Sequence, residues 1–239
     1  MTADLNGVYG MLRKAYGKQG WWPIVNPESG RSEYGIGAPR NDDDIFEIAV
    51  GAILTQNVAW VNVEKAITSL KRSRLLAPER LHRAGNDKIA GCITSAGYYN
   101  QKAKKIKNFT GWFRGYGFSF ADIVKIKTPL LRRELLGING VGPETADSIL
   151  LYGLRRKIFV IDAYTKRIYS RLGLIGRDDS YEKIQEFFHC GFRGDPGKYN
   201  EYHALIVVHG KDVCKNKPLC HSCCLRQMCA LRRAFRIPS

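Results

Sequence analysis

The sequence predicts an all-α fold. Apolar residues recur at helical spacing along most of the 239 residues, and no convincing apolar–polar alternation extends over five or more positions. β character is confined to the short apolar link Ile158–Ile161. With 44% hydrophobic and 25% charged residues, the composition is that of a globular chain with a sizeable core.

About ten short helices follow from this periodicity. The first is Leu5–Tyr16, and an aromatic- and glycine-rich stretch comes after it. Asn41 to Asp44 supply N-cap side chains for the second, Ile45–Leu54. The remaining helical segments are 59–71, Leu75–Ala84, Asp87–Ser95, Asn100–Phe113, Leu130–Leu136, Glu144–Leu154, Ala163–Leu172, Tyr181–Cys190 and Asn200–Gly210.

The chain is strongly basic, with 38 Lys and Arg against 22 Asp and Glu and a formal net charge of +16. This surplus indicates a polyanionic partner, nucleic acid before an anionic membrane surface, unless the surface is merely basic. No run of 18 apolar residues is present to span a membrane. Residues 1–10 lack the features of a secretory signal, so we expect a cytoplasmic protein.

Residues 135–146 are typical of two helices joined by Gly140-Val141-Gly142, with Pro143 in the first turn of the second helix. Two glycines permit a tight turn whose N–H groups are unobstructed by Cβ atoms and suit a phosphate. Val141 would fill the gap between the helices. In so basic a chain, the pattern favours a helix-hairpin-helix clamp on the DNA backbone over an ordinary αα-hairpin.

Asp162 follows the apolar link and precedes the helix Ala163–Leu172. A carboxylate there is partly desolvated yet stabilised by the helix dipole, although the position also suits a simple N-cap. From Leu135 to Leu172 the chain resembles the helix-hairpin-helix superfamily of base-excision DNA glycosylases, although its 153–157 loop lacks their proline. The resemblance implies that Asp162 is the catalytic carboxylate.

Two segments of the first half resemble endonuclease III. Phe46–Asn57 resembles the helix that ends in a DNA-probing glutamine, which implies that role for Gln56. Gly97–Ala103 resembles the G-x-Y-N-x-K-A loop, whose second residue wedges into the duplex. This implies a wedge role for Tyr98. The alternative is that Tyr98 is an ordinary aromatic residue on the surface. Extruding a base from the duplex costs a few kcal/mol. A polar side chain that fills the vacated space, such as Gln56, and a wedge such as Tyr98 would offset that cost.

Five of the seven cysteines lie between residues 214 and 229, whereas Cys92 and Cys190 stand alone as expected core residues. The crowding indicates a metal or cluster site rather than a disulfide scaffold. Endonuclease III relatives hold a [4Fe–4S] cluster on four cysteines separated by six, two and five residues, against five, two and five here. The resemblance implies this cluster, with zinc as the alternative. The implied ligands are Cys214, Cys220, Cys223 and Cys229, with an additional Cys224.

Glu144 stands two residues past the last glycine of the hairpin. Bifunctional members of the superfamily have a lysine there, which forms a Schiff base with the sugar. Glu144 cannot do so, which favours a monofunctional glycosylase that uses water. Adenine glycosylases also lack the lysine but are much longer.

Trp21-Trp22-Pro23, the segment 142–152 and the stretch at Phe46 resemble the type III 3-methyladenine DNA glycosylases. The resemblance implies a base pocket of Trp21, Trp22, Phe46 and Glu144, in which aromatic faces stack on a cationic alkylated purine. Core packing is the alternative for the tryptophans. Two other functions stay open: an endonuclease III-like glycosylase, with or without lyase activity, for damaged pyrimidines or mismatches, and a DNA-binding module without catalysis.

The resemblance implies a two-lobed helix-hairpin-helix DNA glycosylase fold with a C-terminal iron–sulfur loop. Residues 38–156 would form a helical lobe that ends with the hairpin, and residues 1–37 and 157–239 would form the lobe with Asp162 and the cluster. The expected partner is double-stranded DNA containing a damaged base, bound by a monomer associated with the nucleoid.

Overall fold

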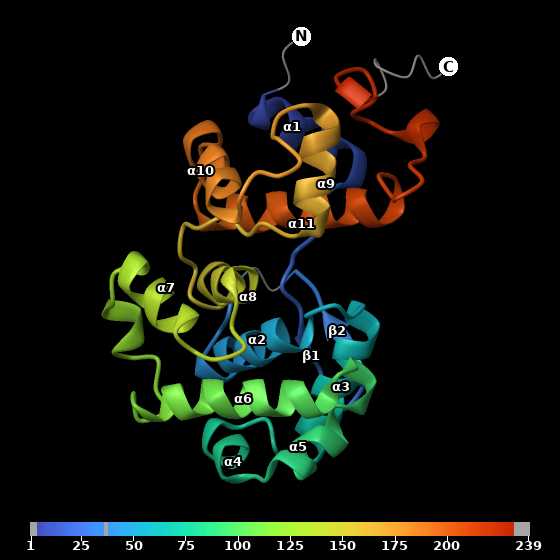
Figure 1. Cartoon of the computed structure of the whole chain (residues 1–239). Helices are drawn as coiled ribbons and strands as arrows, with labels where there is room; N and C mark the ends of the chain where they lie inside the picture. Colours follow the sequence, from blue (N-terminus) through green and yellow to red (C-terminus); the bar gives the residue numbers. More distant parts are fainter. Residues whose placement is uncertain (1–3, 36–37, 232–239) are drawn as a thin grey trace. The chain divides into compact units, whose positions relative to one another are not determined.

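The computed structural model describes residues 4–35 and 38–231. Contacts divide the chain into a middle unit, Trp22–Arg156, and a terminal unit formed by Met1–Trp21 and Lys157–Ser239. Helices dominate both units, which confirms the predicted all-α class (Figure 1). Among the described residues, no helix is long and apolar enough to cross a membrane.

The middle unit is organised around α2 (Asp42–Leu54), which is buried along most of its length. As predicted, Asn41 caps this helix, its side-chain oxygen accepting the N–H of Asp44 at 2.9 Å. The other elements are β1 (Ile24–Val25), β2 (Ser32–Glu33), α3 (Trp60–Arg72), α4 (Pro78–Arg83), α5 (Asn86–Cys92), η1 (Thr94–Ala96), α6 (Tyr99–Arg114), η2 (Ile123–Lys125), α7 (Thr128–Leu136), α8 (Pro143–Ser148) and the π-helical turn η3 (Ile149–Gly153). Contacts from α3, α6, α8 and η3 converge on α2 (Figure 1).

The two short strands correct the expected boundary after residue 37. They pair antiparallel, Ile24 opposite Glu33, and pack against α2. The N–H of Val25 donates to Glu47 at 2.7 Å. A Cβ on Gly51 would lie 3.0 Å from the Trp22 ring, so this glycine lets the ring approach the helix closely. The segment from Trp22 onward therefore belongs to the middle unit.

The terminal unit contains α1 (Leu5–Tyr16), α9 (Ala163–Leu172), α10 (Tyr181–Gly191), α11 (Pro196–Asp212) and η4 (Cys220–Ser222). α11 contacts both α1 and α9. The core of the unit is aromatic, with Phe159 stacked on Phe188 at 3.9 Å between ring centroids. The hydroxyl of Tyr202 donates to the carbonyl of Leu5 at 2.7 Å, joining the two ends of the chain.

The link Ile158–Ile161, expected to have β character, forms no strand. It is buried, and side chains of α10 take the backbone groups that a neighbouring strand would have used. His189 accepts the N–H of Phe159 at 3.0 Å, and Gln185 donates to the carbonyl of Phe159 at 2.7 Å. The hydroxyl of Tyr181 accepts the N–H of Ile161 at 3.2 Å. Buried backbone groups need such partners, and these hold the segment that leads to Asp162.

Candidate active site and DNA-contacting surface

Asp162 is the N-cap of α9, held at the end of the braced link. Its Oδ1 accepts the backbone N–H of Thr165 at 2.7 Å and the hydroxyl of the same residue at 2.8 Å. The side chain faces the positive end of the helix dipole and is only 9% exposed. The structure thus provides a carboxylate fixed in one orientation, and its catalytic role stays a prediction.

His203 of α11 lies beside this carboxylate, with Nε2 3.7 Å from Oδ2 of Asp162. Burial lowers the pKa of His203, and the charge of Asp162 opposes that shift only in part. The imidazole is therefore neutral at pH 7, so it does not cancel a negative charge on the aspartate. Sequence reasoning missed His203, because a histidine within an apolar helix gives no sign of its neighbour.

The hairpin between α7 and α8 has the expected geometry. Gly140 has a φ of +94°, in the region that favours glycine, and a Cβ on it would lie 2.3 Å from Cγ of Lys105. Val141 and Ile138 are buried beneath the turn. Within the part of the chain that the structure describes, the N–H groups of Gly140 and Gly142 meet no hydrogen-bond acceptor. They are the donors predicted to bind phosphate.

The structure brings Gln56 to this hairpin. Its side-chain Nε2 donates to the carbonyl of Gly140 at 3.1 Å and to the hydroxyl of Thr145 at 2.9 Å. The ammonium group of Lys105 donates to its Oε1. The predicted DNA-probing side chain is therefore docked on the predicted phosphate clamp. The contact with Gly140 also holds the peptide group between Gly140 and Val141.

Tyr98 lies in the turn between η1 and α6 and is 71% exposed. Its φ of +45° and the +62° of Gly97 place two successive residues at positive φ. A large exposed aromatic side chain held in an unusual backbone conformation suits a wedge, and that role stays a prediction.

Glu144 is exposed in the first turn of α8, so the position of the Schiff-base lysine carries an acid. The predicted aromatic pocket requires a correction. Phe46 is 1% exposed and stacks on Phe109 and Phe113 at centroid distances of 6.2 and 5.9 Å, so it has no ring face for a base. It belongs to the core of the middle unit.

Trp22 is 7% exposed and packs against Trp60 and Tyr152, at 5.4 and 5.2 Å between centroids. These contacts favour the core-packing alternative for this tryptophan. Trp21 is partly exposed, and its pocket role stays a prediction.

None of the seven cysteines forms a disulfide, and the predicted ligands are partly buried. Burial raises the pKa of the Cys223 thiol to about 12, and the charges of Cys224, Cys214 and Cys229 add to this, so these thiols lie near one another. The sulfurs are chemically suited to iron or zinc. Across the described residues, however, no three Cys, His, Asp or Glu side chains are placed to hold a metal ion. Cys190, an expected core residue, is exposed instead.

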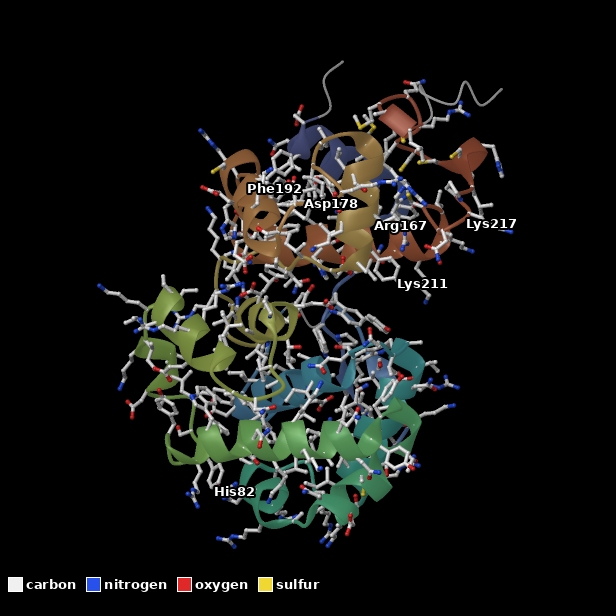
Figure 2. The ribbon with its side chains drawn as sticks, viewed as in Figure 1. His82, Arg167, Asp178, Phe192, Lys211 and Lys217 are labelled. Atoms are coloured by element: carbon white, nitrogen blue, oxygen red, sulfur yellow. The ribbon has the colours of Figure 1, made fainter. Side chains whose placement is uncertain are left out.

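Two arginines of α9 hold the cysteine-containing segment, and sequence reasoning missed both. Arg167 donates to the carbonyls of Gly210 and Cys214, each at 2.8 Å (Figure 2). Arg171 donates to the carbonyl of Asn216 at 3.0 Å and lies 3.4 Å from Sγ of Cys214. Their spacing of four residues was the available signal, because it places both on one face of the helix that Asp162 caps.

Comparisons with known proteins identify the family. Residues 50–192 match the "HhH-GPD superfamily base excision DNA repair protein" family. A protein of Methanocaldococcus jannaschii named "Putative DNA repair glycosylase" is 44% identical over 225 residues, 93% of this chain and 94% of that protein. Endonuclease III of Sulfolobus acidocaldarius is 30% identical over 226 residues, 94% of each chain. The chain belongs to the HhH-GPD superfamily of base excision DNA repair proteins and is a DNA glycosylase.

Solved structures confirm the predicted fold. The 3-methyladenine DNA glycosylase of H. pylori, bound to 1,N6-ethenoadenine, is 25% identical with a TM-score of 0.71, covering 87% of this chain and 98% of that chain. A non-covalent endonuclease III–DNA complex shares the fold with a TM-score of 0.74 and 18% identity, covering 99% of this chain and 100% of that chain.

Proposed function

We propose that this chain is a monofunctional DNA glycosylase, which hydrolyses the N-glycosidic bond of a flipped damaged base and leaves the abasic strand intact. The observation that carries the proposal is a buried carboxylate, Asp162, fixed by two hydrogen bonds from Thr165. Such a group stabilises the positive charge that develops on the sugar as the base departs, and it orients the attacking water. An acid at position 144 supplies no amine for a Schiff base, so water is the nucleophile.

The middle unit would bind and open the duplex. The free N–H groups of Gly140 and Gly142 would bind phosphate oxygens, and this contact carries no base specificity. Gln56 and Tyr98 would then occupy the space left by the extruded base. We propose that the enzyme performs these steps as a monomer on double-stranded DNA, in the cytoplasm and in association with the nucleoid.

We further propose that the base is an alkylated purine of the 3-methyladenine type. The likeness of Trp21-Trp22-Pro23 and of residues 142–152 to the type III enzymes supports this, as does the 25%-identical H. pylori structure. Alkylation at N3 or N7 makes the base cationic and therefore a good leaving group. Its departure needs little assistance from a general acid. Trp21 and Glu144 remain proposed to face the base.

A damaged pyrimidine or a mismatched base is the second candidate substrate. The 30%-identical endonuclease III favours it, and so does the burial of Phe46, which removes one wall of the proposed aromatic pocket.

A panel of single-lesion duplexes tests these proposals, with free base and strand nicks measured separately. We expect release of 3-methyladenine without nicks. Release of only oxidised or mismatched pyrimidines would replace the substrate, and nicking by the protein alone would contradict the monofunctional mechanism.

We also propose that Cys214, Cys220, Cys223 and Cys229 hold a [4Fe–4S] cluster, for which the all-thiol donor set is suited. The bound cluster would have a structural role. It would fix the exposed basic segment with Lys215 and Lys217, which α9 already braces through Arg171, for contact with phosphates (Figure 2).

A further inference from the structure

One charged side chain of the middle unit is buried at a place where the proposed reaction does not use it. Lys102, in the first part of α6, is 2% exposed. Its ammonium group donates to the carbonyl of Leu54 at 2.7 Å and to the carbonyl of Ala96 at 2.8 Å. Burying an ion is costly, and an apolar side chain of similar size would fill the same space more cheaply. The charge therefore needs an explanation.

The two acceptors lie at the ends of the elements that precede the DNA-probing residues. Leu54 is the last residue of α2, two positions before Gln56. Ala96 is the last residue of η1, two positions before Tyr98. The C-terminal end of a helix presents carbonyls with partial negative charge. The ammonium group of Lys102 bonds to one carbonyl at each of these two ends and so connects α2 to η1. The backbone N–H of Lys102 also donates to the carbonyl of Tyr98, at 3.0 Å.

Tyr98 shows why such a connection is needed. Its left-handed conformation is unfavourable for a residue with a side chain, and such a conformation persists only where the surroundings hold it. The tyrosine ring is 71% exposed and contributes little packing of its own. The bonds of Lys102 to Ala96 and to Tyr98 hold the backbone on both sides of the strained position.

We propose that Lys102 is a positioning residue, which ties the turn of Gln56 to the turn of Tyr98 and so sets both side chains for joint insertion into the duplex. The proposal rests on the proposed function of these two residues in opening DNA. It assigns to one side chain a direct hydrogen-bonded connection between the two turns.

The titration of Lys102 gives a readout that a purely structural role would not. Burial lowers its pKa to about 8, and among the described residues the neighbouring charge of Lys105 is the one other cause and acts in the same direction. Loss of the proton removes the charge that strengthens both hydrogen bonds. Between pH 8 and its ordinary value of 10.5, the unfolded chain binds this proton more tightly, so this group makes the fold more stable as pH rises. Loss of this proton therefore does not by itself destabilise the fold as pH rises.

The experiment uses the full-length protein and a duplex with a tetrahydrofuran abasic analogue opposite 2-aminopurine, whose fluorescence reports unstacking. Lys102→Met keeps most of the side-chain volume, and Lys88→Met is the control, because Lys88 is exposed on α5 of the same unit. At saturating protein, we expect the fluorescence gain to fall about 10-fold or more for Lys102→Met, since one lost hydrogen bond from a charged group changes an equilibrium by about this factor. Lys88→Met should match the wild type, and the wild-type gain should decline as pH rises from 7 to 9.

Equal fluorescence for the two folded variants would overturn the proposal. If Lys102→Met does not fold, the wild-type titration decides, and an unchanged gain between pH 7 and 9 contradicts the role. Excision of lesions is measured in parallel. Wild-type protein that opens the abasic duplex but excises nothing would contradict the proposed catalytic function and leave the role of Lys102 to be decided by fluorescence.

Discussion

Alanine at each glycine of the hairpin separates DNA contact from folding, because only Gly140 needs a glycine for the backbone conformation of the turn. Gly142 has a φ of −89° and a ψ of 179°, which any residue adopts, and a Cβ there would meet nothing within 4 Å. We expect Gly142→Ala to leave the free energy of unfolding unchanged or to raise it by about 0.4–1 kcal/mol. At Gly140, positive φ costs an alanine about 1–2 kcal/mol, and Lys105 must also move.

On DNA, the Cβ of Gly142→Ala would occupy space that a phosphate needs in order to reach the turn. A hydrogen bond to a charged group contributes about 1.5–3 kcal/mol, so its loss should weaken binding roughly 10- to 150-fold. Fluorescence anisotropy with undamaged duplexes of several sequences measures this loss, and urea unfolding measures stability. Gly140→Ala should lose both affinity and stability. Wild-type affinity in Gly142→Ala, or a loss confined to one sequence, would refute phosphate binding by this turn.

Four further predictions follow from the same structure. Asp162→Asn keeps an N-cap, so it should fold and bind lesion DNA, yet single-turnover excision should fall at least about 10²-fold; retained excision would remove Asp162 from catalysis. Borohydride should trap no wild-type protein–DNA adduct, whereas Glu144→Lys should introduce some trapping; an efficient wild-type adduct would reveal another amine. Anaerobically purified protein should contain about four iron atoms per chain, lost in Cys220→Ser and kept in Cys224→Ser; one zinc without iron would contradict the cluster. Phe46→Ala should lower the free energy of unfolding by about 3–5 kcal/mol, and Phe46→Leu should retain excision; loss of excision in a stable Phe46→Leu would restore its pocket role.

The sequence predicts correctly those elements that are determined by interactions between residues close together in the chain. The cap at Asn41 and the glycines of the hairpin act within a few residues, and α1 and α9 have the predicted bounds. The fold class also followed from periodicity. These features depend on backbone preferences and short-range hydrogen bonds, which the order of residues displays directly.

Features that depend on contacts between residues far apart in the sequence were missed or predicted wrongly. The resemblance implied a base pocket at Phe46, whereas the rings that stack on it come from α6, which the local sequence does not indicate. The apolar link Ile158–Ile161 was expected to have β character, but it forms no strand because side chains of α10 bond to its backbone. Lys102 is the lysine of the G-x-Y-N-x-K-A loop, but nothing in the sequence indicates that two helix ends meet at its ammonium group.

The division of the terminal unit between both ends of the chain has a consequence for synthesis on the ribosome. α1 emerges first, with Leu5, Val8 and Leu12 on the face that it buries in the folded protein. Its main partner, α11, starts at Pro196, so this face stays uncovered until the long segment between the two helices has been made. At roughly 5–20 residues per second, the delay lasts on the order of ten seconds or more. The middle unit, continuous in sequence, can fold during that interval. Closure of the terminal unit is therefore the late, long-range step, and the nascent chain is most open to aggregation or chaperone binding at α1.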